Sequence, residues 1–158
     1  WDVRPSARYP TLEMRITDVC TRLDDSIAIA ALYVCILSML YRLRKSNQRW
    51  RIYPRTMINE NRWLAQRYGV TGTMVDFGIG RPVAYADLLE EVIELVREDA
   101  ERMDCVAEIG HAREIVRRGT SAQHQQDAYQ AAIAAGADPH EALKGVVDML
   151  IEETTVGL

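Results

Sequence analysis

The chain has 158 residues, of which 48% are apolar and 27% are charged, the proportions of an ordinary soluble globular protein with one hydrophobic core. The net charge is −4, but residues 1–86 carry 13 Lys and Arg against 7 Asp and Glu, whereas residues 87–158 carry 6 against 16, so the first part is expected to face anions. The three cysteines are widely spaced without a CxxC pair, which argues against a disulfide framework or a zinc site and indicates a cytoplasmic protein.

Residues 1–17 read as a loop followed by one strand. From residue 11 to residue 16, polar and apolar residues alternate, which is the period of a half-buried β-strand. Glu13 and Arg15 therefore share one face of the strand, about 6.6 Å apart along it. This face is either a solvated surface whose charges form cross-strand pairs, or a metal-binding carboxylate beside a phosphate-binding guanidinium.

The chain opens on Trp1 within what reads as functional sequence, and a single strand is not stable alone. We therefore expect this chain to be the C-terminal portion of a longer protein. The missing N-terminal part of the same polypeptide is expected to supply the neighbouring strands of a larger sheet. An exposed strand edge also favours self-pairing, which makes a homodimer a further expectation.

A long helix is predicted to start at Asp24 or Asp25 and to end near Asn47. Residues 26–41 of this helix carry no charge, as a membrane span would. However, 16 residues fall short of the ~20 that cross a bilayer, and the stretch includes three alanines and two tyrosines. We therefore predict a fully buried central helix in which Cys35 is a buried free thiol, and no membrane association.

Six basic and two aromatic residues lie between residues 42 and 55, and no acid occurs from residue 26 to residue 59. Such a stretch can bind nucleic acid, can place arginines against the carbonyl groups of a helix end, or can form a phosphate-facing loop. The acidic remainder of the chain and the lack of a helix-turn-helix, RRM or KH signature argue against nucleic acid.

Residues 55–69 predict a second helix closed by Gly69, and residues 73–77 and 82–85 predict a hairpin around a Gly-Ile-Gly turn. The sequence DFG in this hairpin is also found in the kinase magnesium loop, but no HRD-like loop or VAIK strand precedes it. The sequence GIG lacks the third glycine of a dinucleotide site. Both motifs are therefore interpreted as turn sequences.

The remaining residues predict four helices. Residues 87–103 are amphipathic, and residues 105–118 form a shorter helix that stops at a glycine. The capping sequences TSAQ at 120–123 and DPHE at 138–141 start the last two helices.

The polar residues of these helices are not assigned to a site. His111, His124 and His140 are expected to be surface or cap residues rather than ligands. An acidic stripe is expected to be a solvated helix face; its members are Glu90, Glu91, Glu94 and Glu98.

Several motifs, taken in order, resemble those of the carboxylate–amine ligases related to bacterial glutamate–cysteine ligase, the type 2, YbdK-like group. The resemblance covers essentially the whole chain and corresponds to the C-terminal portion of that family. The motifs are WDVRPSARYPTLEMRITDVCTRLDD (1–25), ENRWLAQRYG (60–69), DFG (76–78), ADLLEE (86–91), RRGTSAQ (117–123) and VVDMLIEET (146–154).

The resemblance implies a glutamine-synthetase-like fold, in which a curved antiparallel sheet holds ATP, Mg²⁺ or Mn²⁺ and an amino-acid substrate on its concave face. The expected fold class is α+β. This chain would be its predominantly helical C-terminal part and would contribute helices, one strand and a small hairpin from the larger sheet. The family activates a carboxylate as an acyl phosphate with ATP, and an amine then displaces phosphate to form an amide.

The resemblance also implies roles for residues of the first strand. Glu13 would be a metal ligand, because Mg²⁺ prefers carboxylate oxygens. Arg15 would be catalytic and would bind the transferred phosphoryl group, and Arg4 would bind nucleotide phosphates. The roles of a second set of matching residues stay open; they are Glu60, Asn61, Arg62 and Asp76.

The resemblance therefore implies that residues 1–158 are a C-terminal fragment of a ligase catalytic domain. Residues 1–23 would be a strand segment of the active-site sheet, 24–69 helices, 70–85 a hairpin and 86–158 C-terminal helices. The substrates would be small amino acids, and the fragment alone is expected to be inactive. The alternative is a non-catalytic helical module that binds a protein partner.

Overall fold

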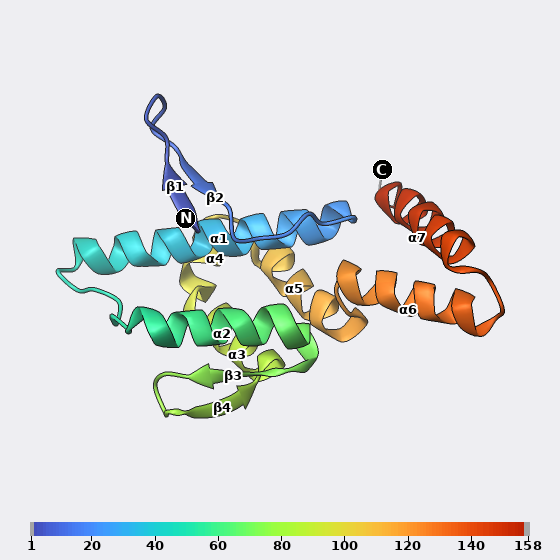
Figure 1. The fold of residues 1–158 in the computed structure, drawn as a ribbon. Helices are drawn as coiled ribbons and strands as arrows, with labels where there is room; N and C mark the ends of the chain where they lie inside the picture. The colour runs from blue at the N-terminus through green and yellow to red at the C-terminus, as the bar shows by residue number, and fades with distance from the viewer. Residues whose placement is uncertain (1, 157–158) are drawn as a thin grey trace.

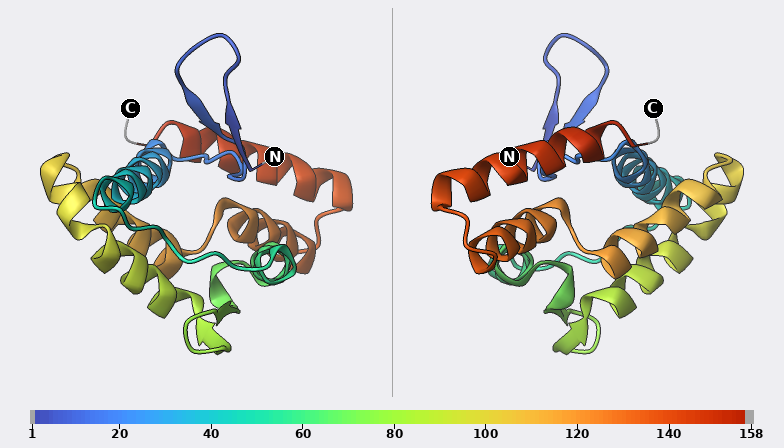
Figure 2. Two further views of the ribbon diagram at one scale, coloured as in Figure 1. Left: turned by 90° about the vertical axis from the view of Figure 1, so that its left-hand side faces the viewer. Right: turned by 90° about the vertical axis from the view of Figure 1, so that its right-hand side faces the viewer.

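The computed structural model describes residues 2–156. Over these residues the chain forms seven α-helices, one 3₁₀ turn and two small antiparallel strand pairs, which confirms a predominantly helical α+β chain (Figure 1). Helices α6 and α7 lie on the opposite side of the molecule from α3 and α4 (Figure 2). The elements in order are β1 (Val3–Pro5), β2 (Leu12–Met14), α1 (Leu23–Lys45), α2 (Arg55–Tyr68), the 3₁₀ turn (Gly69–Thr71), β3 (Thr73–Asp76), β4 (Arg81–Ala84), α3 (Tyr85–Leu95), α4 (Arg97–Arg102), α5 (Val106–Arg118), α6 (Ser121–Ala134) and α7 (Pro139–Thr154).

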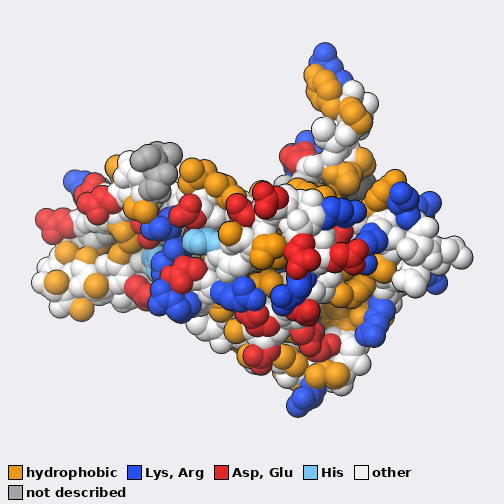
Figure 3. Space-filling model, turned by 180° about the vertical axis from the view of Figure 1, so that it is seen from behind, with side chains coloured by type: hydrophobic (Ala, Val, Ile, Leu, Met, Phe, Trp, Pro, Cys, Tyr) orange, Lys and Arg blue, Asp and Glu red, His pale blue; other side chains and the backbone are white. Residues whose placement is uncertain are grey.

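The N-terminal segment is a hairpin rather than a loop followed by one strand. Strand β2 pairs antiparallel with β1, and Arg4 lies directly opposite Glu13. The partner strand was missed because it has only three residues and ends in Pro5, which leaves too short a run for alternation to be visible. The hairpin projects from the body of the molecule, so most of its side chains are exposed (Figure 3).

The core lies where one face of α1 packs against α4 and α5. Its largest fully buried side chains are Ile109, Val96, Asp99 and Cys35, and burial of the Cys35 thiol confirms the prediction for that residue. The Cys35 sulfur lies 3.3 Å from the sulfur of Cys105, and both thiols are free. These contacts fix α1 along the body of the protein.

The prediction of a fully buried central helix is wrong for the described chain. Helix α1 buries one face only, and its opposite face stays exposed at residues such as Ile27 and Val34. By length and composition α1 is apolar enough to cross a membrane, with 17% of its most apolar window buried. The sequence contains no polar stripe on this face, so it could not reveal that half of the helix is left uncovered.

Helix α2 and the hairpin β3–β4 form a second packing unit. Gly69, predicted to close α2, has a φ of +59°, a conformation that strains other residues. The predicted hairpin is confirmed, and its strands pair from Thr73 with Ala84 at one end to Asp76 with Arg81 at the other. The exposed acidic stripe on the following helices is also confirmed as a solvated face.

The C-terminal helices begin where their capping sequences predict. Thr120 and Asp138 each accept hydrogen bonds from backbone N–H groups of the first turn, and each forms a complete capping box. The predicted helix over residues 87–103 is instead divided into α3 and α4 at Val96. Helices α6 and α7 pack mainly on each other.

Candidate functional site

Three charged side chains converge on one face of the β1–β2 hairpin. Arg15 Nε donates a hydrogen bond to Glu13 Oε1 at 2.9 Å, and Arg4 Nε donates to Glu13 Oε2 at 2.9 Å. Arg4 also places a terminal guanidinium nitrogen 2.5 Å from the same oxygen. Glu13 and Arg15 thus share a face as predicted, and the structure adds Arg4 to them from the neighbouring strand.

The group is open to solvent, and the Glu13 carboxylate is ionised at neutral pH. Desolvation would raise the pKa of Glu13, but the hydrogen bonds from Arg4 and Arg15 outweigh it and hold the pKa below the ordinary glutamate value. The three side chains are each about half exposed. Two guanidinium groups fixed beside one carboxylate leave a net positive face that can bind an anion such as phosphate.

The hairpin is attached to α2 through Asp2. Arg62 forms an ion pair with the Asp2 carboxylate, and the backbone N–H of Arg15 donates to the Asp2 carbonyl oxygen at 2.8 Å. Arg62 belongs to the motif whose role was left open. It connects the helix to the strand pair that carries Glu13, so its role in the described chain is to position the hairpin.

Two other residues of the open set have structural roles. The side-chain amide of Asn61 accepts from the Val75 N–H at 2.7 Å and donates to the Val75 carbonyl at 2.8 Å, and it thereby pairs with β3 as a strand would. Asp76 Oδ1 accepts from the Gly78 N–H at 2.6 Å, which shapes the β3–β4 turn. Glu60 is exposed on α2.

Glu13 is the predicted metal ligand in this region, and the nearby Asp2 carboxylate is paired with Arg62. No group of three or more His, Cys, Asp or Glu side chains able to hold a metal ion occurs between residues 2 and 156. Both oxygens of Glu13 are engaged by guanidinium groups, so a metal ion bound there would displace one of these contacts and take its other ligands from elsewhere. The ionised state of Glu13 is the state that a metal ligand requires.

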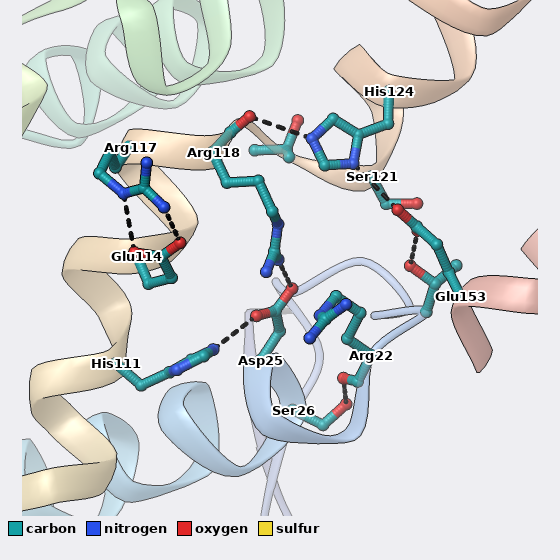
Figure 4. A network of polar contacts seen from close by, with 12 residues as sticks. Arg22, Asp25, Ser26, His111, Glu114, Arg117, Arg118, Ser121, His124 and Glu153 are labelled. Atoms are coloured by element: carbon teal, nitrogen blue, oxygen red, sulfur yellow. Dashed lines mark hydrogen bonds and ion pairs between the residues drawn. The ribbon is translucent and has the colours of Figure 1, made fainter. Parts of the chain in front are cut away.

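A second polar network joins the start of α1 to α5 (Figure 4). The Asp25 carboxylate, 8% exposed, contacts His111 Nε2 at 2.9 Å and accepts from a terminal nitrogen of Arg118 at 2.5 Å. These partners are 86 and 93 residues away in sequence. The expectation that His111 is a surface or cap residue is therefore wrong, because it pairs with a buried carboxylate.

Figure 4 also shows polar contacts that join α6 to the end of α7. His124 Nε2 donates to the Arg118 carbonyl oxygen at 3.0 Å, and its Nδ1 lies 3.1 Å from Glu153 Oε1. Glu153 also accepts from the Thr21 hydroxyl at 2.8 Å. His124, like His111, is a connecting residue rather than a surface one, whereas His140 is exposed at the start of α7 as expected.

These networks were missed because their partners are distant in sequence. Asp25 was considered only as one of two residues at which the helix could start, and isolated histidines on helices give no local signal of a partner. The signal that marks these positions is the set of family motifs at residues 1–25, 117–123 and 146–154, which contain Asp25, Arg118 and Glu153.

Comparison with known proteins gives consistent matches. The model of glutamate–cysteine ligase family 2 (GCS2) matches residues 1–150. Proteins with the provisional name glutamate–cysteine ligase 2 are similar over the whole chain: 58% identical in Rhodospirillum rubrum, 48% in Jannaschia sp. and 41% in Solibacter usitatus. The matched part is 41%, 42% and 39% of the length of these relatives, so the chain spans about two-fifths of each.

Proposed function

The chain belongs to glutamate–cysteine ligase family 2, and from this we propose that the protein carrying it is an ATP-dependent carboxylate–amine ligase. Such an enzyme transfers the terminal phosphoryl group of ATP to a carboxylate, which gives an acyl phosphate and ADP. An amine then attacks the acyl carbon and displaces phosphate, which leaves an amide. Glutamate and cysteine are the substrates that the relatives' name suggests. The observation that carries the proposal is the convergence of Arg4 and Arg15 on Glu13, on one exposed face of the hairpin.

In this proposal Arg4 and Arg15 bind phosphate oxygens. A transferred phosphoryl group spreads negative charge over its oxygens, and fixed guanidinium groups stabilise that charge. Glu13 holds both guanidinium groups in place before ATP binds, because each donates to a different oxygen of the same carboxylate. The cost of ordering two long side chains is then met before the substrate arrives.

Glu13 is the residue of this chain that would hold Mg²⁺ or Mn²⁺. The metal, when bound, would neutralise phosphate charge. The lowered pKa of Glu13 keeps its carboxylate in the ionised form that ligation needs. The remaining ligands would come from polypeptide outside the matched part. We accordingly propose that the hairpin extends a larger, glutamine-synthetase-like sheet.

The 158 residues alone are expected to be inactive, since they span about two-fifths of the relatives' length. We propose a cytoplasmic location, which the three free cysteines support. Amide formation that consumes ATP, measured with residues 1–158 alone, would contradict the requirement for the rest of the protein.

The test of the phosphate-binding face compares two arginines of the hairpin in the full-length enzyme. Arg15→Ala should lower kcat about 10²-fold or more and weaken ATP binding, because it removes a charge-assisted contact to phosphate. Arg8→Ala is the matched control, since Arg8 lies on the same hairpin and packs over the Tyr9 ring without contacting Glu13. Equal effects of the two changes, or none from either, would remove Arg15 from the site and favour a non-catalytic interaction module.

The test of the metal role is Glu13→Gln. Because glutamine retains the size of glutamate but loses its charge, this change should raise the Mg²⁺ concentration needed for half-maximal activity and lower turnover at saturation. Circular dichroism and urea unfolding should remain as in the unaltered enzyme, because Glu13 is about half exposed. A normal Mg²⁺ dependence would exclude Glu13 as a ligand.

A further inference from the structure

Helix α1 carries a second apolar stripe, opposite the stripe that packs in the core. The exposed stripe repeats at spacings of four, three, four and seven residues, which places its members on one side of the helix. We call this stripe the outer seam, and it consists of Leu23, Ile27, Ala30, Val34 and Tyr41. Val34 is 46% exposed and Tyr41 is 65% exposed.

The buried stripe of α1 repeats with the same heptad-like spacing. Its members are Asp25, Ala28, Leu32, Cys35 and Met39, and they face α4 and α5. In Figure 2 α1 is viewed along its axis, with α4 and α5 to one side. The partners of the buried stripe are themselves helices, so the same spacing on the outer seam can likewise pack against a helix.

The outer seam is too apolar to be a solvated surface. No charged residue lies between Ser26 and Tyr41, so over this length the face lacks the charged side chains that usually cover the exposed side of a helix. The seam extends over about 27 Å, taking 1.5 Å per residue from Leu23 to Tyr41. The small Ala30 near its middle allows another helix to approach closely.

Both ends of α1 are held to the body of the protein by ion pairs. Asp25 pairs with His111 and Arg118 at one end, and Arg42 pairs with Asp99 at 2.9 Å at the other. A membrane-spanning α1 would have to break these contacts and leave the buried Asp25 and Asp99 carboxylates without their partners. The ion pairs therefore favour a protein partner that docks on α1 where it lies.

We propose that a helix from the polypeptide outside the matched part packs lengthwise along the outer seam of α1. About three-fifths of the length of the relatives lies outside the part that this chain matches, which is ample for such a helix. α1 would then be a central helix with a helix on each side. The proposal rests on the length of the relatives and the seam, and it holds whether or not the protein is a ligase.

The direct test is photo-crosslinking in the full-length protein. Benzoylphenylalanine is placed one position at a time at Ile27, Val34 and Tyr41, which are seven residues apart. Each should crosslink within the same chain to residues outside 1–158, and the three captured sites should be displaced by about seven residues from one to the next, as for two helices in register. Val106, 51% exposed on α5, is the control position and should give no crosslink to those sites.

Each other outcome overturns the proposal. Crosslinks between two chains would assign the seam to a second copy, and crosslinks to phosphatidylcholine–phosphatidylglycerol vesicles would assign it to a membrane. Captured sites about three residues apart would indicate a strand, because a strand rises about 3.3 Å per residue and the probes are about 10.5 Å apart. The absence of crosslinks at all three positions would mean that the seam faces water.

A matched pair of substitutions tests the seam through stability. Val34→Asp should lower the Tm of the full-length protein by about 5 °C or more, because it places a charge in a helix–helix contact. Val106→Asp makes the same change at a similarly exposed valine in the first turn of α5 and should leave the Tm within about 2 °C. Equal, small effects would show that Val34 has no partner.

Discussion

Asp99 is a fully buried carboxylate in the core, and its oxygens accept hydrogen bonds from three side chains. It accepts from Ser38 at 2.8 Å, from Arg42 at 2.9 Å and from Arg102 at 2.5 Å. Burial would raise the pKa of Asp99, but the hydrogen bonds from Arg42 and Ser38 outweigh it and lower the pKa. The carboxylate is therefore charged in the folded protein at neutral pH.

Removing this charge should destabilise the protein. Asp99→Asn retains the size of the side chain but leaves two arginines without their buried counter-charge, so we expect a loss of about 3 kcal/mol in the free energy of unfolding. Urea unfolding at pH 7 measures this loss. Glu98→Gln is the control, because Glu98 contacts the same Arg42 but is 70% exposed, and its loss should stay within about 0.5 kcal/mol. A comparable loss from both changes would show that burial of Asp99 is unimportant.

Cys35 should be chemically inert in the folded protein. Burial, together with the neighbouring Cys105, raises the pKa of its thiol to about 12, so almost none of it is thiolate at pH 8. In native protein, iodoacetamide should modify Cys35 at least about a hundredfold more slowly than the partly exposed Cys20, as followed by peptide mass spectrometry. The two rates should become equal in urea. Equal rates in native protein would contradict the burial of Cys35.

At the scale of single residues, the sequence predicted which residues share a face but not which residues contact them. The two-residue period placed Glu13 and Arg15 together, since that depends on local geometry alone. The third member, Arg4, lies across a strand pair that was not predicted, and its pairing depends on register. Asp99 gave no signal, because a carboxylate within a charged helix segment normally faces solvent.

At the scale of elements, the best predictions were those with a local physical cause. The capping boxes at Thr120 and Asp138 and the glycine at the end of α2 were confirmed, because each satisfies or releases backbone groups within one turn. The division between α3 and α4 at Val96 was missed. Val96 is fully buried and the apolar period continues through it, so the break is visible only in the backbone.

Asn61 shows how one side chain can hold two elements together. Its amide pairs with both backbone groups of Val75, so Asn61→Ala would leave a partly buried N–H and carbonyl without partners. We expect a loss of about 2 kcal/mol in the free energy of unfolding and faster hydrogen exchange at the Val75 amide. NMR-detected exchange measures the second effect directly.

The control for this prediction lies two residues earlier on the same helix. Asn59 is exposed, so Asn59→Ala should leave exchange at Val75 unchanged and should not lower stability, since alanine is the better helix former. Rapid exchange at Val75 in the unaltered protein would contradict the pairing itself.

At the scale of the whole molecule, the sequence predicted a mostly helical α+β chain and, apart from β1 and the break between α3 and α4, the order of its elements. It did not predict how the last two helices are attached. Helices α6 and α7 pack on each other and meet the rest of the chain through Thr21, Arg118, His124 and Glu153. The Thr21–Glu153 contact joins residues 132 apart in sequence. Such polar contacts have no periodicity, so hydrophobic patterning could not indicate them, and the family motifs mark the positions without naming their partners.

This attachment should weaken in acid. Desolvation would raise the pKa of Glu153, but the hydrogen bonds from Thr21 and His124 outweigh it and lower the pKa below the ordinary value of about 4.5. A lowered pKa means that the contact contributes fully above pH 4.5 and is lost as the pH falls below that value towards the pKa of the folded state. Hydrogen exchange of α6 and α7, corrected for intrinsic rates, should therefore accelerate below pH 4.5.

Glu153→Gln isolates the contribution of this carboxylate. Glutamine can still accept from Thr21 but carries no charge for His124, so exchange in α6 and α7 at pH 7 should become about tenfold faster, and its acceleration below pH 4.5 should be reduced. Glu152→Gln is the control, because Glu152 is exposed on the same turn of α7. If Glu152→Gln has the same effect, the charge of α7 as a whole, and not the contact with Thr21 and His124, sets the pH dependence.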